Sequence, residues 1–162
     1  MEYEQLFKAL WEERVRYLIC GGLAVNIYGI PRMTADIDLL LDFENGNLSR
    51  FDHVLKKLMY SPLTPIPVSE LSDKSRRMEL VKDMNMIAYS FYNNRSNYMS
   101  VDVLLDPPFT FDDLWEKRET RALDKYEVTL VSLPHLIEMK SFANRKQDQD
   151  DVTLLSKLLN RR

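Results

Sequence analysis

The spacing of apolar residues along the chain changes between helical and strand-like periods, and it predicts an ordered series of elements. Residues 3–13 place apolar side chains three and four positions apart, which predicts an amphipathic helix. Residues 15–20, VRYLIC, are apolar, aromatic and β-branched, which predicts a buried strand. Gly21 and Gly22 then interrupt the strand, and the next residues predict a short helix ended by Gly29.

The rest of the chain continues this alternation between helices and strands. Further helices are predicted at residues 48–59, 70–82, 111–117, 133–144 and 147–160. Further strands are predicted at residues 35–42, 84–92, 98–105, 121–123 and 127–131. The proline-rich segment 61–70 predicts an extended connection, and residues 93–97, NNRSN, predict a turn. The pattern as a whole predicts an α/β (α+β) fold, with helices packed on a mixed β-sheet and a helical C-terminus.

Composition limits the class of protein. A length of 162 residues suits a single domain, residues 1–162, with a substantial core. The single cysteine, Cys20, excludes an internal disulfide and a cysteine-based zinc site. The apolar runs are too short to cross a bilayer and the Glu-rich start has no signal segment, so we expect a cytoplasmic protein without a membrane partner. The net charge of −3 gives no general attraction for nucleic acid, although basic residues can still cluster locally.

Two carboxylates stand together in an apolar segment. Asp36 and Asp38 are two positions apart in a predicted strand, so both point to one face while Ile37 faces the other. Neighbouring carboxylates repel each other and are costly to bury, but a divalent cation between them offsets that cost. Oxygen-only ligands suit Mg²⁺ or Mn²⁺, which also bind substrate phosphates.

Other residues complete a plausible site for phosphate chemistry. Gly21 and Gly22 lie where a strand gives way to a helix, and free N–H groups at a helix start favour a phosphate. Asp102 is a lone acid in an apolar predicted strand, and it is the candidate for a third metal ligand. A phosphate-binding turn beside a metal site suits phosphoryl or nucleotidyl transfer from a nucleoside triphosphate.

The order of these pieces resembles the nucleotidyltransferase superfamily built on the DNA polymerase β palm. The pattern Gly-Gly-x-Ala, then Tyr-Gly-x-x-Arg-x-Thr-x-Asp-Ile-Asp-Leu, runs from Gly21 to Leu39 and looks most like the AbiEii-type bacterial nucleotidyltransferases. Residues 136–152, LIEMKSFANRKQDQDDV, are similar to a lysine-bearing helix and a basic-acidic motif that are common in those proteins. The resemblance spans most of the chain.

This resemblance implies a fold, a site and partners. It implies the palm-type mixed sheet, Mg²⁺ or Mn²⁺ as cofactor, a nucleoside triphosphate as substrate and an antitoxin as a candidate partner, because AbiEii-type enzymes resemble toxins of toxin–antitoxin systems. The implied metal ligands and catalytic residues are Asp36, Asp38 and Asp102. The implied nucleotide-binding residues are Gly21, Gly22, Arg32, Thr34, Lys140, Arg145 and Asp148, with Asp148 or Asp151 holding substrate or orienting Lys140 and Arg145.

Each feature also has a plain structural interpretation. The two glycines can form an ordinary strand-to-helix turn, and Asp36 and Asp38 can lie on a solvated face. Lys140 and Arg145 can be surface charges, and the acids of residues 148–151 can begin a helix whose dipole favours them.

Three functional hypotheses stay open at this point. The first is an enzyme that moves a nucleoside monophosphate from a triphosphate to a protein hydroxyl, an RNA end or a small molecule. The second is a non-catalytic subunit that binds nucleotide or a partner with the same fold. The third, antibiotic adenylation, is less favoured because the drug site of such enzymes usually needs a second domain or a dimer. For an enzyme this short, a partner protein or a second copy in a homodimer is a route to completing the site.

Overall fold

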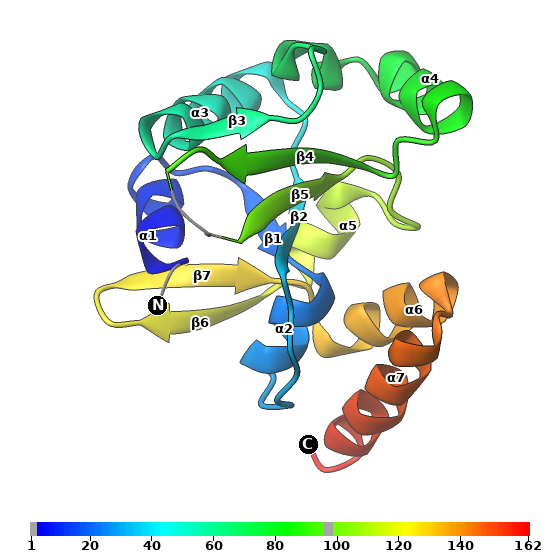
Figure 1. Ribbon diagram of the computed structural model, residues 1–162. Coiled ribbons are helices and arrows are strands. Elements are labelled where there is room, and N and C mark those ends of the chain that lie inside the picture. The colour runs from blue at the N-terminus through cyan, green and yellow to red at the C-terminus, as the bar shows by residue number, and fades with distance from the viewer. Residues whose placement is uncertain (1–2, 96–98) are drawn as a thin grey trace.

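In residues 3–95 and 99–162, which the computed structural model describes, seven strands form one mixed sheet in the order β3-β4-β5-β2-β1-β7-β6 (Figure 1). The strands are β1 (Tyr17–Ile19), β2 (Asp36–Leu41), β3 (Tyr60–Pro62), β4 (Ala88–Asn93), β5 (Ser100–Leu104), β6 (Glu119–Leu123) and β7 (Tyr126–Leu130). The predicted α+β class is therefore confirmed.

Helices connect these strands and cover the sheet. They are α1 (Glu4–Glu12), α2 (Gly21–Ile27), α3 (Asn45–Lys57), the 3₁₀ helix η1 (Val68–Ser72), α4 (Lys74–Met84), α5 (Phe111–Glu116), α6 (Leu133–Ala143) and α7 (Lys146–Leu159). Side-chain caps begin several of them: Asp73 accepts from two backbone N–H groups at the start of α4, and Ser132 caps α6 ahead of Pro134.

In the centre of the sheet one face is apolar, and the other face carries the acids of β2 and β5. In β2 and β5 the buried residues Ile37, Leu39, Val101 and Val103 alternate with half-buried ones. Because side chains alternate across a strand, this alternation directs the polar residues between them to the opposite face. β1 lies beside β2 in antiparallel register, and all three of its residues are buried.

The C-terminal helices form a pair that extends away from the sheet. Figure 1 shows α6 and α7, in orange and red, on the side of the molecule opposite α3 and α4. The two helices pack on each other, and α6 also contacts α2. Asn144 adopts a left-handed conformation with φ +49° and so reverses the chain between them. The predicted helical C-terminus is therefore confirmed as an α-hairpin.

Two predictions about the region before β4 were wrong. Residues 61–70 were expected to be an extended connection, but this region contributes β3, which pairs with β4, and the 3₁₀ helix η1. Pro62 is tolerated because β3 is an edge strand, where a missing N–H leaves no ladder bond unmade. The strand predicted from residue 84 begins at Ala88, since α4 continues to Met84 and Asn85 ends it with φ +49°.

The other boundaries differ by a few residues. α2 begins at Gly21 instead of after Gly22, so both glycines belong to its first turn. β6 begins at Glu119, two residues before the predicted start. Part of the turn predicted at residues 93–97, and the predicted start of the next strand at residue 98, lie outside the described residues.

Candidate active site

Carboxylates from two neighbouring strands face the same side of the sheet. Asp38 in β2 and Asp102 in β5 occupy directly paired positions in parallel register. Asp36 lies two residues before Asp38 and is paired with Ser100 of β5. Because side chains two positions apart in a strand share a face, the sheet gathers these three acids on one side.

Burial dominates the electrostatics of this group. The pKa of Asp38 is raised to about 6, first by burial and then by the charges of Asp102 and Asp36, while the nearby cation Lys140 opposes the shift. Burial also raises the pKa of Asp102, whereas a hydrogen bond with Ser90 acts in the opposite direction. The carboxylates are therefore held close together in a setting that disfavours their charges.

The fit of this group to a metal is best at the Asp38–Asp102 pair. Asp36 is held to one side by Ser100, whose hydroxyl donates to Asp36 Oδ1 over 2.7 Å. Among the described residues, no three His, Cys, Asp or Glu side chains converge as a metal-binding group. Asp38 and Asp102 offer oxygen donors and mutual repulsion, which a hard divalent cation would offset. The three-carboxylate metal site remains a prediction.

Gly21 lies against the Asp38 carboxylate, where no larger residue fits. Its φ is +60°, and a Cβ built on it would be 1.9 Å from Asp38 Oδ2. The backbone N–H of Cys20 donates to the Asp38 carbonyl over 2.9 Å, which ties the strand-to-helix turn to β2. Only glycine allows the first residue of α2 to approach the carboxylate this closely.

Gly22 serves a separate packing contact. A Cβ on it would be 2.8 Å from Thr34 Oγ1 and 3.2 Å from Arg32 Nε. Thr34 in turn donates to the Asp36 carbonyl over 3.1 Å, and Arg32 forms an ion pair with Asp151 of α7. The segment that leads into β2 is therefore packed against α2 and α7, through Gly22, Thr34 and Arg32.

A cleft of about 610 Å³ opens beside the carboxylates. Its polar lining consists of Asp38, Asp102, Asp106, Lys140, Arg145 and Asp148. Its apolar lining comes from the start of β4, the end of β5, the segment that follows β5, and α6. These residues are Ile87, Ala88, Leu104, Pro107, Pro108, Leu136, Met139, Phe142 and Ala143. Cys20 and Gly21 line it as well. The cleft therefore places charged groups and an apolar wall around one space.

Lys140 is the buried cation of the cleft, and two acids of α7 hold it. Its Nζ is 3.2 Å from Asp148 Oδ1 and 2.9 Å from Asp151 Oδ2, and none of the three side chains is more than 6% exposed. Asp151 also pairs with Arg32. It therefore links the segment between α2 and β2 to the C-terminal helices. Removing one partner from such a buried network leaves an uncompensated charge.

Asp148 makes a second set of contacts, to Arg145. Its Oδ2 accepts from the Arg145 side-chain Nε over 2.7 Å and from the Arg145 backbone N–H over 3.1 Å, which caps α7. Burial alone would raise the pKa of Asp148, but hydrogen bonds from Arg145 and Lys140 outweigh it and lower the pKa below its usual value. Asp148 is therefore an anchor for both cations.

The structure brings some of the predicted residues together and leaves others apart. Those that line the cleft are Gly21, Asp38, Asp102, Lys140, Arg145 and Asp148, with Asp36 beside them. Those that do not line it are Gly22, Arg32 and Thr34, whose side chains or backbone are used in packing. Their predicted contact with a nucleotide stays a prediction: here they pack in the segment between α2 and β2, and Arg32 pairs with Asp151 of α7.

Sequence reasoning missed the apolar wall of the cleft. Ile87 and Phe142 line it and are 75% and 71% exposed, which is unusual for large apolar side chains. Nothing in the sequence marks them, because an apolar residue near a strand or in a helix is expected to be core until its packing is known.

None of the described helices combines the length and apolar composition needed to cross a membrane.

The family match, together with the shared fold, identifies the class of protein as a nucleotidyltransferase. A solved structure, the antigenic nucleotidyltransferase-like protein from Paracoccidioides brasiliensis, shares the fold with a TM-score of 0.57 and 16% identity, over 96% of this chain and 72% of that one. The family model described as the nucleotidyl transferase AbiEii toxin of a type IV toxin–antitoxin system matches residues 6–152, and the chain belongs to this family. No curated protein matches the chain in sequence.

Proposed function

We propose that this nucleotidyltransferase moves a nucleoside monophosphate from a nucleoside triphosphate to a hydroxyl group of an acceptor and releases pyrophosphate. The observation that carries the proposal is one cleft lined by both the Asp38–Asp102 pair and the buried cation Lys140. Paired carboxylates suit a metal-bound phosphate, and lysine suits a leaving pyrophosphate. Membership in the AbiEii family supports the same reaction class.

The transfer exchanges one phosphorus–oxygen bond for another. The acceptor oxygen forms a bond to the α-phosphorus while the bond from that phosphorus to the bridging oxygen of the β-phosphate breaks. The acceptor proton moves to a carboxylate, for which we assign Asp102 because it lines the cleft directly beside Asp38. Lys140 and Arg145 neutralise the charge that develops on the pyrophosphate.

Asp38 and Asp102, with Asp36 beside them, are the residues that would hold the metal ion. Mg²⁺ or Mn²⁺ at this pair would supply charge neutralisation at the phosphates when bound. The raised pKa of Asp38 means that a cation and a proton compete for the same group near pH 6. Metal affinity is therefore expected to rise with pH through this range.

The position of Lys140 is set by the C-terminal helices. Asp148 and Asp151 hold its ammonium group from one side, within 3.2 Å and 2.9 Å. A buried side chain with two fixed partners has few rotamers left, so its charge is pre-organised for a phosphate that enters the cleft. We assign Asp148 and Asp151 as positioning residues for this charge.

The apolar wall supports a place for the nucleobase. Phe142 and Ile87 are both largely exposed and both line the cleft that holds the carboxylates. Every base has an apolar face that stacks on such side chains, and stacking is tolerant of base identity. We therefore assign the base to this wall and the triphosphate to the charged side.

The biological setting proposed for this reaction is a toxin–antitoxin pair. The family is that of a type IV toxin, so the acceptor would be a cellular molecule whose modification arrests growth and an antitoxin would oppose it. Three acceptor classes are compatible with the cleft: a protein hydroxyl, an RNA end and a small molecule. The experiment below separates them.

The test is transfer of label from each α-labelled nucleoside triphosphate, with Mg²⁺ or Mn²⁺, to total protein, total RNA or a small-molecule extract. Asp38→Asn is expected to reduce transfer by at least about a hundredfold, because it removes a carboxylate from the reacting centre. Asp42→Asn is the matched control: Asp42 follows the same strand but pairs with Arg16 over 2.5 Å, outside the cleft.

The proposal fails if no triphosphate gives label transfer to any of the three pools. It also fails if Asp38→Asn transfers label as well as Asp42→Asn does. Binding of a triphosphate without transfer would instead favour the non-catalytic subunit.

A further inference from the structure

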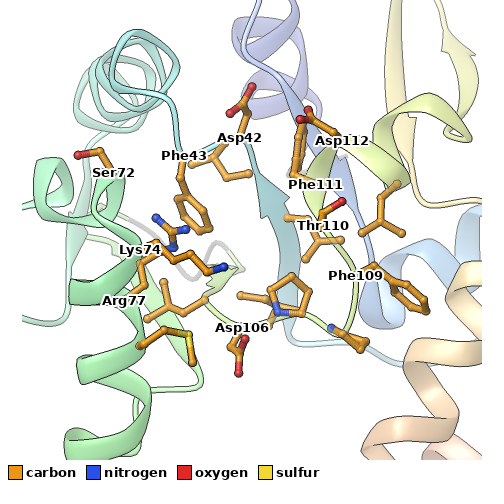
Figure 2. Close-up of a pocket in the computed structure, with 18 residues that line it drawn as sticks. Asp42, Phe43, Ser72, Lys74, Arg77, Asp106, Phe109, Thr110, Phe111 and Asp112 are labelled. Atoms are coloured by element: carbon orange, nitrogen blue, oxygen red, sulfur yellow. The ribbon is translucent and has the colours of Figure 1, made fainter.

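A second cavity, of about 550 Å³, lies at the C-terminal end of strands β2 and β5, next to the cleft (Figure 2). Its walls are the C-terminal end of β2 and the residues after it, helix α4, and the segment 105–112. Residues that line both this cavity and the cleft are Leu104, Asp106, Pro107 and Pro108. No other residue of this cavity lines the cleft in which the transfer is proposed.

Two cations from one face of α4 line this cavity. Lys74 and Arg77 are three residues apart, so they share a helix face, and Figure 2 shows both on the α4 side of the space. In the described part of the chain, neither forms an ion pair with a carboxylate. Arg76, the neighbour of Arg77, does the opposite: it pairs with Glu70 and Glu79 at 2.8 Å each, away from the cavity.

The environment of Arg77 is unusual for a charged group. Its side chain is half-buried, donates to the Leu71 carbonyl over 2.5 Å and lies 4.2 Å from the centre of the Phe43 ring. Burial lowers the pKa of this guanidinium, and the charge of Asp73 acts in the opposite direction. A half-buried cation without a carboxylate partner gains most from an anion, and its planar face already lies on an aromatic ring.

The acids that line the cavity form no ion pair with these two cations. Asp42 is held by Arg16 over 2.5 Å, and Asp112 lies 3.7 Å from the same guanidinium. Figure 2 shows Asp106 at the lower side of the cavity with its carboxylate turned away from Lys74. Lys74 and Arg77, the cations of the lining that pair with no described carboxylate, therefore lie together on the α4 side.

The cavity also has aromatic lining. Phe43 lines the cavity from the residues after β2, and Phe109 and Phe111 line it from the segment 105–112. We propose that this cavity is a second binding site, for a small ligand that joins an aromatic ring to an anionic group, either a phosphate or a carboxylate. The anion faces Lys74 and Arg77, and the ring packs among the phenylalanines. The site is independent of the transfer reaction, because none of the groups proposed to react lies in it.

The test is calorimetric titration of the whole chain with phenyl phosphate and with benzoate, which separate the two anions. Phenol supplies the ring alone, and inorganic phosphate supplies the anion alone. We expect one of the ring-bearing anions to bind at least about tenfold more tightly than phenol or phosphate. Arg77→Gln and Lys74→Gln should each weaken that binding by about tenfold or more.

Three variants make the result decisive. Arg76→Gln removes a charge from the same helix turn and should leave binding unchanged. Asp38→Asn alters the cleft and should also leave it unchanged, which separates this site from the proposed function. Lys74 is exposed, so its substitution tests the charge without disturbing packing even if Arg77→Gln unfolds the chain.

Three results would overturn the proposal. One is that neither ring-bearing anion binds more tightly than phenol and phosphate. The second is that Lys74→Gln binds as well as Arg76→Gln. The third is that Asp38→Asn abolishes binding, which would place the ligand in the cleft.

Discussion

Asp38 and Asp102 are directly paired on the adjacent parallel strands β2 and β5, so two carboxylates from distant parts of the chain share one face of the sheet. The arrangement is costly for the isolated protein, because burial raises the pKa of both groups and the charge of Asp102 raises the pKa of Asp38 further. A pair that is unfavourable alone and favourable with a cation is expected to couple stability to pH and to metal.

The first prediction concerns the pH dependence of stability without metal. The pKa of Asp38 is about 6 in the folded chain, above that of an unfolded aspartate, so the folded state favours the proton. Its contribution to stability is present below about pH 4 and is lost as pH rises through about 6. Asp38→Asn should therefore raise the free energy of unfolding at about pH 8 by roughly 1–2 kcal/mol, after a discount for partial exposure, and change it little at pH 4. Urea unfolding at both pH values checks this, and an equal effect at both would contradict it.

The second prediction concerns metal. Mn²⁺ or Mg²⁺ should raise the melting temperature at about pH 8 and much less at about pH 5, because a protonated Asp38 does not bind a cation. Asp102→Asn should remove most of the increase, whereas Asp42→Asn should retain it. Differential scanning fluorimetry with a metal titration measures the effect. An increase that survives in Asp102→Asn would exclude the paired-carboxylate site.

The third prediction separates the glycines that have positive φ. Gly21 and Gly29 have φ +60° and +94°, but a Cβ would meet the Asp38 carboxylate only at Gly21, with nothing within 4 Å at Gly29. Both alanine variants should lose about 1–2 kcal/mol from the left-handed backbone. Only Gly21→Ala should also lose metal-dependent stabilisation, because it displaces Asp38. If both variants retain the metal-dependent stabilisation, the contact between Gly21 and Asp38 does not contribute to metal binding.

The fourth prediction concerns the buried ion network. Asp151 pairs with both Lys140 and Arg32, so Asp151→Asn should destabilise the chain by about 3–5 kcal/mol. The control is Asp52→Asn, which breaks an exposed pair with Lys56 and should cost at most about 1 kcal/mol. Chemical denaturation compares the two, and similar costs would show that the network is not a structural link.

The fifth prediction concerns the apolar wall of the cleft. Phe142→Ala should weaken binding of all four nucleoside triphosphates by about tenfold, since stacking is worth about 1–3 kcal/mol for each base. Binding of tripolyphosphate, which has no base, should not change, whereas Lys140→Met should weaken both. Leu63→Ala, an exposed apolar residue outside the cleft, is the control. Equal loss of tripolyphosphate binding in Phe142→Ala would argue against stacking.

Much of the site could be predicted because its chemistry is local in sequence. The spacing of Asp36 and Asp38 in an apolar strand sets their common face, and the lone acid Asp102 in a second apolar strand indicates a partner. Gly21 was found because a glycine pair between a strand and a helix marks a close backbone approach.

The errors share one cause, which is the path of the chain between elements. The contacts of Arg32 and Thr34 likewise depend on this path, because the segment between α2 and β2 packs both residues against Gly22 and pairs Arg32 with Asp151 of α7. Strand β3 was missed because its three residues gain order only from pairing with β4. The apolar wall at Phe142 was missed because exposure depends on what a helix packs against.

The sequence by itself determined most of the elements and the candidate reacting groups, because hydrophobic period and residue chemistry are properties of short segments. The tertiary structure alone decided that Asp38 faces Asp102, that Lys140 lies between Asp148 and Asp151, and that a second cavity lies beyond the shared segment after β5. These facts depend on which strands become neighbours and how the C-terminal helices turn back at Asn144. Long-range burial sets both, and it acts between residues that no local pattern connects.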